Sequence, residues 1–314
     1  MSGLVQAVLD AVEFVDVSRD FAVLAVQGPR SRELLAPLVA GGLLGPATDL
    51  GTLTPEQATA AAADVDKTIP FSTALEDVTV AGVPGVSMLR ITFVGELGFE
   101  LHIPAARAAE VYRAVRAAAA ELERRYAGSR VRVLARDCGY RAMDSLSAEK
   151  GYRHWHADLA NSDSPLEAAI GFTVLPRLKA TTAAEDPFSG RAALEKQRDE
   201  GVAKRLVCLT LNDADDSEPF CATPPNAAPL HGSETIWRDE ECVGIVRSTA
   251  FGHATRATIV YGYVHRAPGG PKLLEKWLDA GKWSVGDKGV RRAASLQLKA
   301  PFDPSNIRLR AIEH

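Results

Sequence analysis

The sequence predicts an α+β protein in which a mixed helix-and-strand part, residues 1–182, precedes a smaller β-rich part, residues 183–314. Residues 78–103 alternate between apolar and other side chains, which is typical of strands. Residues 105–126 repeat their apolar side chains at helical spacing. After a joint rich in threonine, alanine and charge at 179–186, short apolar runs separated by turn residues indicate a small barrel or sandwich, of which we favour the barrel.

Bulk composition excludes several protein classes. The net charge of 36 − 40 = −4 argues against a nucleic-acid partner, because phosphate contacts need clustered basic surface. No apolar run is long enough for a transmembrane helix, and the first residues carry no targeting signal. No two cysteines have the spacing of a zinc or redox motif, so reduced thiols are expected at Cys138, Cys208, Cys221 and Cys242.

The first part is expected to alternate between helices and strands. Gly28 and Pro29 separate a buried strand from a helix, because proline fits the first helical turn. In chain order the expected elements are a helix at 2–12, a strand at 21–27, a helix at 31–39, a helical insertion at 56–64, a hairpin of 78–80 and 88–93 turning through 82–85, a strand at 99–103 and a helix at 105–126.

The second part is expected to be mostly strands. A helix at 190–198 precedes them, and a surface loop at 214–232 interrupts them because it is rich in aspartate, proline and alanine. The expected strands are 205–211, 234–237, 243–246, 257–264 and 294–299.

The stretch 139–167 carries the densest group of polar and aromatic side chains. Tyr140, Met143 and Leu146 predict a helix that Gly151 ends. The following loop contains Tyr152, Arg153, His154, Trp155, His156 and Asp158. Such a loop is either a buried corner or the lining of a site. The two histidines and the aspartate also suggest a metal, but no second cluster supplies further ligands, so no metal site is assigned.

Glu96 lies in a glycine-flanked loop, Gly95-Glu96-Leu97-Gly98, between two apolar strands. A carboxylate there can accept two parallel hydrogen bonds from a planar donor edge, such as that of a pterin or a guanidine. From spacing alone a solvated turn glutamate is the stronger interpretation. No phosphate-binding glycine motif is present, so the chain is not expected to bind a dinucleotide by itself.

Several runs resemble one enzyme family. GYRAMDSLSAEKGYRHWHADL with DSPLEA, and FVGELGFELHIP, resemble the C-terminal half of sarcosine dehydrogenases. These are related to dimethylglycine dehydrogenases and, more distantly, to the aminomethyltransferase (T-protein) of glycine cleavage. The resemblance extends over nearly the whole chain, through DVSRDFAVLAVQGPRSRELL, IPFST, KRLVCLTL, YGYVH and APFDPSNIRLR.

The resemblance implies an aminomethyltransferase-like folate-binding domain, incomplete at its N-terminus, and a C-terminal barrel. In such enzymes FAD in the N-terminal half oxidises an N-methyl amine, and tetrahydrofolate in the C-terminal half takes up the one-carbon unit as 5,10-methylenetetrahydrofolate. By this resemblance Glu96 contacts the pterin and Trp155 stacks on it or closes the cavity. Tyr140, Arg153 and Phe71 are weaker candidates for the same pocket. No catalytic residue is assigned.

Two departures from the family pattern leave alternatives open. Met143 stands where the T-protein has an arginine, and the chain is expected to begin after the segment that carries the family's folate aspartate. Asp16 belongs to a later strand and is not given that role. The flavin half and the first folate segment are expected to be absent, so a flavin-binding chain or domain would be a partner. The alternatives are a stand-alone aminomethyltransferase subunit, a structural remnant and, last, a metal hydrolase. The expected compartment is the mitochondrial matrix in a eukaryote and the cytoplasm in a bacterium.

A late start would leave sheet edges and apolar faces uncovered. We therefore expect residues 1–314 in isolation to be poorly soluble or to need a partner chain. Size-exclusion chromatography and thermal melting test this, and a monodisperse protein that melts cooperatively would contradict it.

Overall fold

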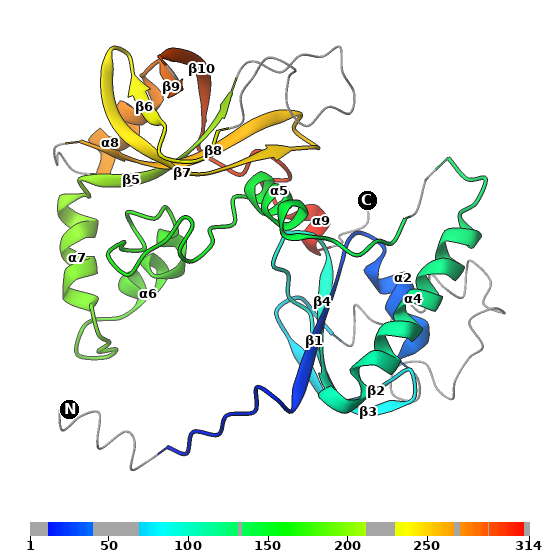
Figure 1. Cartoon of the computed structure of the whole chain (residues 1–314). Helices are drawn as coiled ribbons and strands as arrows, with labels where there is room; N and C mark the ends of the chain where they lie inside the picture. The colour runs from blue at the N-terminus through cyan, green and yellow to red at the C-terminus, as the bar shows by residue number, and fades with distance from the viewer. Residues whose placement is uncertain are drawn as a thin grey trace. The chain divides into compact units, whose positions relative to one another are not determined.

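The computed structural model of the chain describes residues 12–39, 69–130, 134–211, 230–266, 271–287 and 289–310. The chain forms two compact units (Figure 1). The first comprises Met1–Thr92, Glu96–Asp137 and Ile307–His314, and the second comprises Phe93–Gly95 and Cys138–Asn306. The helices expected at 2–12 and 56–64, Cys221 and most of the loop at 214–232 lie outside the described residues. No helix within the described ranges is long and apolar enough to cross a membrane.

The first unit contains a four-stranded antiparallel sheet in the order β1-β4-β3-β2 (Figure 1). The strands are β1 (Phe21–Gln27), β2 (Ala74–Val80), β3 (Val83–Leu89) and β4 (Gly98–Pro104). The hairpin between β2 and β3 was predicted, but its turn is at Ala81 and Gly82 and not at 82–85. Both residues have positive φ, as a two-residue turn that follows the strand twist requires.

Helices pack on one face of this sheet and close its core. They are α2 (Ser31–Leu35), the 3₁₀ turns η1 (Ala36–Leu38) and η3 (Ala105–Arg107), and α4 (Ala108–Arg125). The predicted apolar face of α4 is confirmed, since Val111, Val115 and Leu122 are buried against the strands. The predicted helix at 31–39 tightens into a 3₁₀ turn after Leu35. On the other face of β1, Phe21 and Val23 are exposed.

The second unit is built around a closed antiparallel barrel, which confirms the predicted β-barrel (Figure 1). The strand order is β10-β5-β8-β7-β6-β9. The strands are β5 (Lys204–Leu211), β6 (Thr235–Arg238), β7 (Glu241–Gly252), β8 (Ala257–His265), β9 (Trp283–Asp287) and β10 (Val290–Gln297). Sequence reasoning missed β9 and the helix α8 (Pro271–Asp279), which packs against the barrel interior through Leu278.

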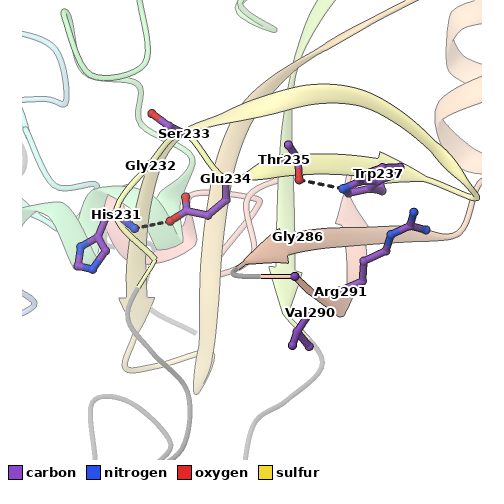
Figure 2. A pocket seen from close by; sticks show the side chains of 10 residues that line it. His231, Gly232, Ser233, Glu234, Thr235, Trp237, Gly286, Val290 and Arg291 are labelled. Carbon is purple, nitrogen blue, oxygen red and sulfur yellow. Dashed lines mark hydrogen bonds between the residues drawn. The ribbon is translucent and has the colours of Figure 1, made fainter.

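A groove opens on the barrel beside β6 (Figure 2). It is lined by the segment His231–Thr235, by Trp237, and by the β9–β10 turn with Gly289 and Arg291. Its wall carries both apolar and charged side chains, and it encloses about 550 Å³.

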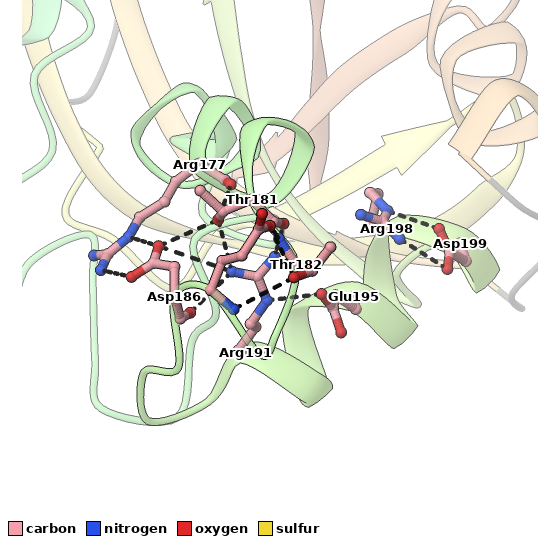
Figure 3. A network of polar contacts seen from close by, with 9 residues as sticks. Arg177, Thr181, Thr182, Asp186, Arg191, Glu195, Arg198 and Asp199 are labelled. Atoms are coloured by element: carbon pink, nitrogen blue, oxygen red, sulfur yellow. Dashed lines mark hydrogen bonds and ion pairs between the residues drawn. The ribbon is translucent and has the colours of Figure 1, made fainter.

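The joint expected at 179–186 is an ordered polar network (Figure 3). It lies between the helices α6 (Leu175–Ala180) and α7 (Arg191–Glu200). The buried Arg191 guanidinium donates to the carbonyl oxygens of Thr181 and Asp186 and to Glu195 Oε1, the last at 2.9 Å. Arg177 pairs with Asp186 and thereby lowers the pKa of that carboxyl. The contribution of this pair is therefore present at neutral pH and is lost as the pH falls through the lowered pKa.

Replacing Arg191 tests this network. Arg191→Ala leaves Glu195 and two backbone carbonyls without their donor, so the free energy of unfolding should fall by about 3 kcal/mol in chemical denaturation. Arg198→Ala is the matched control, because Arg198 forms a surface ion pair with the exposed Asp199, and the effect of this variant should stay within about 0.5 kcal/mol. Equal losses in the two variants would contradict a special role for Arg191.

The helix α5 (Tyr140–Lys150) and strand β7 lie side by side in the second unit (Figure 1). The helix was predicted, but its buried face is largely polar: Ser145, Ser147, Glu149 and Lys150 are buried with Ala148. The Glu149 carboxylate, 2% exposed, accepts hydrogen bonds from Ala254 N at 2.7 Å and Thr255 N at 2.8 Å. Hydrogen bonds to the barrel, more than apolar packing, therefore hold α5 in place.

Glu149→Ala should remove this attachment. The two barrel amides lose their acceptor, so we expect a loss of about 3 kcal/mol and faster hydrogen exchange at Ala254 and Thr255. Asp144→Ala on the same helix is the control, because Asp144 is exposed. If both variants melt at the temperature of the unchanged protein, Glu149 does not hold the helix.

Candidate functional site

The loop after α5 is fixed by hydrogen bonds at both ends. Gly151 ends the helix in the left-handed region, at φ 69°. The buried Asp158 carboxylate accepts from His154 N at 2.8 Å and from the Ser248 hydroxyl of β7. His156 N donates to Leu159 O at 2.8 Å, which closes the loop on itself. The loop therefore has a defined conformation on the barrel surface.

This fixed loop presents an exposed aromatic side chain. Trp155 is 57% exposed although its neighbours are tied down. Arg247 of β7 donates from Nε to Ala157 O at 3.2 Å and from Nη2 to His156 O at 3.3 Å. Of the two interpretations of the sequence, a buried corner is wrong at Trp155, whose ring lies edge-on to the His156 ring and is otherwise exposed. Tyr140, at the start of α5, is 81% exposed.

The segment Phe93–Gly95, which directly precedes Glu96 in the chain, packs on α5 and its loop. Ser147 Oγ donates to Phe93 O at 3.2 Å, and the His154 ring lies 4.7 Å from the Phe93 ring, centroid to centroid. Lys150 lies against Gly95 so closely that a Cβ at Gly95 would be 2.4 Å from Lys150 Cγ. Only glycine fits there, and its φ of 76° is also strained for other residues.

Lys150 is held in this position by a buried ion pair. Its Nζ lies 2.8 Å from Asp303 Oδ2 and donates to Asp303 O at 2.8 Å. Both side chains are almost fully buried, at 2% and 7% exposed. A buried charge is tolerated when it is paired and hydrogen-bonded in this way.

In the first unit, the Glu96 side chain is 12% exposed, and its Oε1 lies 4.0 Å from Arg308 Nη1. Arg308 belongs to α9 (Ile307–Arg310). Arg90 also contacts this helix, donating to Arg310 O at 3.3 Å and to Ile69 O at 3.0 Å. The glutamate is therefore not the solvated turn residue that spacing alone favoured.

The remaining predicted residues occupy different surroundings. Phe71 is partly exposed in the turn before β2, in the first unit. Arg153, in the second unit, donates to Gly151 O and lies beside the barrel strand β8 near the Tyr261 hydroxyl. Burial raises the pKa of Tyr261 and raises that of its neighbour Cys208 to about 11. These two groups stay protonated at neutral pH and belong to the packing beneath α5.

Sequence reasoning identified the loop after α5 and the loop that contains Glu96, but it missed the residues that hold these loops in place. Within each unit the structure shows supports that no spacing rule indicated: Arg308 for Glu96, and Ser147, His154, Lys150 and Asp303 for Phe93–Gly95. The APFDPSNIRLR run, which contains Asp303 and Arg308, was the one available signal. Within the described ranges, no cluster of three or more histidine, cysteine, aspartate or glutamate side chains is arranged to hold a metal ion.

Comparisons with known proteins agree with this architecture. Residues 1–177 match the family model of the GCVT N-terminal domain, and residues 204–303 match that of the glycine cleavage T-protein C-terminal barrel domain. The crystal structure of glycine cleavage system aminomethyltransferase T from Bartonella henselae matches 91% of this chain and 85% of its own, with a TM-score of 0.50. At 16% identity this likeness shows the fold alone.

Two curated relatives have higher identity. The chain is 40% identical over 300 residues to mitochondrial sarcosine dehydrogenase of Mus musculus, covering 96% of this chain and 27% of that protein. It is 33% identical over 235 residues to an aminomethyltransferase of Geobacillus kaustophilus, covering 75% and 50%. The chain thus spans just over a quarter of the length of the sarcosine dehydrogenase. It belongs to the GCVT family, with an aminomethyltransferase fold completed by the closed C-terminal barrel, and it is related to sarcosine dehydrogenase over nearly its whole length.

Proposed function

We propose that the chain is a tetrahydrofolate-binding module of the kind found at the C-terminal end of sarcosine dehydrogenase-like enzymes. It would accept the one-carbon unit released by oxidative N-demethylation and yield 5,10-methylenetetrahydrofolate. The observation that carries this proposal is the state of Glu96: a mostly buried carboxylate beside a cation, directly after a segment that packs on α5. This environment suits a carboxylate that receives a planar donor edge.

The described residues fit a pterin in two respects. Glu96 supplies acceptor oxygens for the amino-pyrimidinone edge, and Arg308 balances its charge. Trp155 supplies an exposed indole on a loop that is already ordered, so stacking costs little conformational entropy. Phe71 and Tyr140 offer further aromatic surface. Arg153 offers a cation, but its guanidinium is already engaged by the Gly151 carbonyl.

The residues of this chain would bind and orient tetrahydrofolate, and the oxidation of the N-methyl amine would take place in a partner chain or domain. Bound tetrahydrofolate would supply the nitrogen nucleophiles that take up the one-carbon unit. Glu96 would hold the pterin ring in one orientation. Any FAD would belong to a partner chain or domain, because this sequence has no dinucleotide-binding glycine motif.

The relatives also bear on partners and compartment. The likeness to sarcosine dehydrogenase supports our proposal of a flavin-containing partner, and the mitochondrial relatives of mouse and human support a matrix location if the protein is eukaryotic. In a bacterium the same module would act in the cytoplasm. We propose no nucleic-acid partner, since the net charge is −4.

The domain division at 182/183 remains a proposal. The two family models end and begin on either side of it, at 177 and 204, whereas the two compact units divide the chain after Thr92, Gly95, Asp137 and Asn306.

A stand-alone aminomethyltransferase subunit is the second candidate. The 33% identity to the Geobacillus kaustophilus aminomethyltransferase favours it. Formation of methylenetetrahydrofolate from an aminomethyl donor by this chain without a flavin partner would support this candidate. Stable folding without any folate affinity would support a structural remnant.

Titration calorimetry with tetrahydrofolate tests the main proposal. We expect saturable binding to the unchanged chain, weakened more than about tenfold in Glu96→Ala because a charge-assisted hydrogen bond to the ring is lost. Glu100→Ala in β4 is the matched control, because Glu100 is paired with Ala25 of β1 and its carboxylate lies 3.7 Å from His102 Nε2. This variant should bind tetrahydrofolate as the unchanged chain does.

Two outcomes would count against the proposal. If the unchanged chain does not bind tetrahydrofolate, the chain alone is not a folate module. If Glu96→Ala and Glu100→Ala bind equally well, the pterin contact lies with other residues. Circular dichroism of each variant separates lost binding from lost folding.

A further inference from the structure

The sheet of the first unit has two edges, and one of them is protected against further pairing. In the order β1-β4-β3-β2 the edge strands are β1 and β2 (Figure 1). Strand β2 carries the acidic residues Glu76 and Asp77, and its pairing with β3 shifts register at two places. Acidic side chains and irregular pairing are devices by which natural proteins prevent another strand from adding to an edge. The β2 edge is therefore closed to a partner strand.

The β1 edge has none of these devices. Its sequence, FAVLAVQ, contains no charged residue, no proline and no glycine. Its register with β4 runs without a shift from Phe21 to Gln27, and β4 is the only described strand that pairs with it. A regular, uncharged edge strand is a template for another strand, because it presents a row of backbone N–H and C=O groups.

The core of the first unit is also open at the β1 edge. Leu24 and Val26 of β1 face this core but are only partly buried. On the opposite face of β1, Phe21 is 41% exposed and Val23 is 52% exposed. The core-facing side chains of the neighbouring strand β4 are instead 0% exposed: Phe99, Leu101 and Ile103. An added strand would bury apolar area on both faces of β1.

The segment that leads into β1 extends this apolar surface. Six of the 17 large apolar side chains that are exposed in the described residues lie between Val12 and Val23, and Phe14 is 73% exposed. An exposed apolar surface of this kind indicates an interaction site.

We propose that β1 pairs with β1 of a second copy of this chain, antiparallel across a two-fold axis. The strand can face itself because it carries no charge, so no like charges lie opposite one another. Self-pairing of β2 would instead bring the acidic side chains of two copies together. The dimer closes, because pairing uses the β1 edge of both copies and leaves only the protected β2 edges.

Sedimentation of the full chain tests this inference. A contact of two seven-residue strands is smaller than a standard stable interface of about 1,600 Å², so monomer and dimer should exchange. We expect the weight-average mass to rise from one chain toward two between about 1 and 100 μM. Over the same range, hydrogen exchange should slow at the amides of residues 21–27 and stay unchanged at those of residues 74–80.

Two edge variants locate the contact. Val23→Lys places a lysine on β1 of each copy, at a position that is already half exposed, and should weaken association at least about tenfold. Glu76→Lys makes the same change of side chain on the β2 edge, where the position is exposed, and should associate as the unchanged chain does. Circular dichroism confirms that each variant is folded.

Three results would each overturn the proposal. They are a monomer at every concentration, assemblies larger than a dimer, and equal association of the Val23→Lys and Glu76→Lys variants. The hydrogen-exchange result decides the matter on the unchanged chain if Val23→Lys does not fold. None of these measurements involves tetrahydrofolate, so failure here and failure of the folate function are separate.

Discussion

The structure of the second unit depends on two adjacent buried charges at the end of α5. Glu149 and Lys150 are both excluded from water, and each is stable only because partners are brought to it. Glu149 receives the amides of the β7–β8 turn, and Lys150 receives Asp303 from the last part of the chain. Because neither charge can be left unpaired, the helix has one position on the barrel. The Tyr261 hydroxyl adds a hydrogen bond to the Ala148 carbonyl at 2.8 Å.

The position of α5 determines what surrounds it. Its C-terminal loop starts at a fixed point and is tied to β7 at Asp158, so Trp155 can be exposed and still be well placed. Its side chains also hold Phe93–Gly95, the residues that lead into Glu96. An exposed indole on a rigid loop is a low-entropy binding surface, which is the physical basis for assigning it to a flat ring.

The barrel contributes more than support. Closing six strands removes sheet edges, and the β9–β10 turn brings Arg291 across to Trp237 of β6. The polar joint around Arg191 connects α6 to α7 through bonds to backbone carbonyls, so the chain enters the barrel from an ordered segment.

The sequence by itself determined the elements whose signal is local. The apolar face of α4, the glycine that ends α5 and most barrel strands follow from periodicity and turn residues, and the motif runs indicated the family. Only the tertiary structure decided which groups meet. Lys150 and Asp303 lie 153 positions apart, and no spacing rule links them. The buried face of α5 is also largely polar and is not the apolar face that its spacing predicted, because hydrogen bonds and an ion pair make the burial of polar side chains favourable there. Periodicity indicates which face of a helix or strand is apolar. The pairing of buried charges depends on contacts between residues far apart in the sequence, which no local pattern predicts.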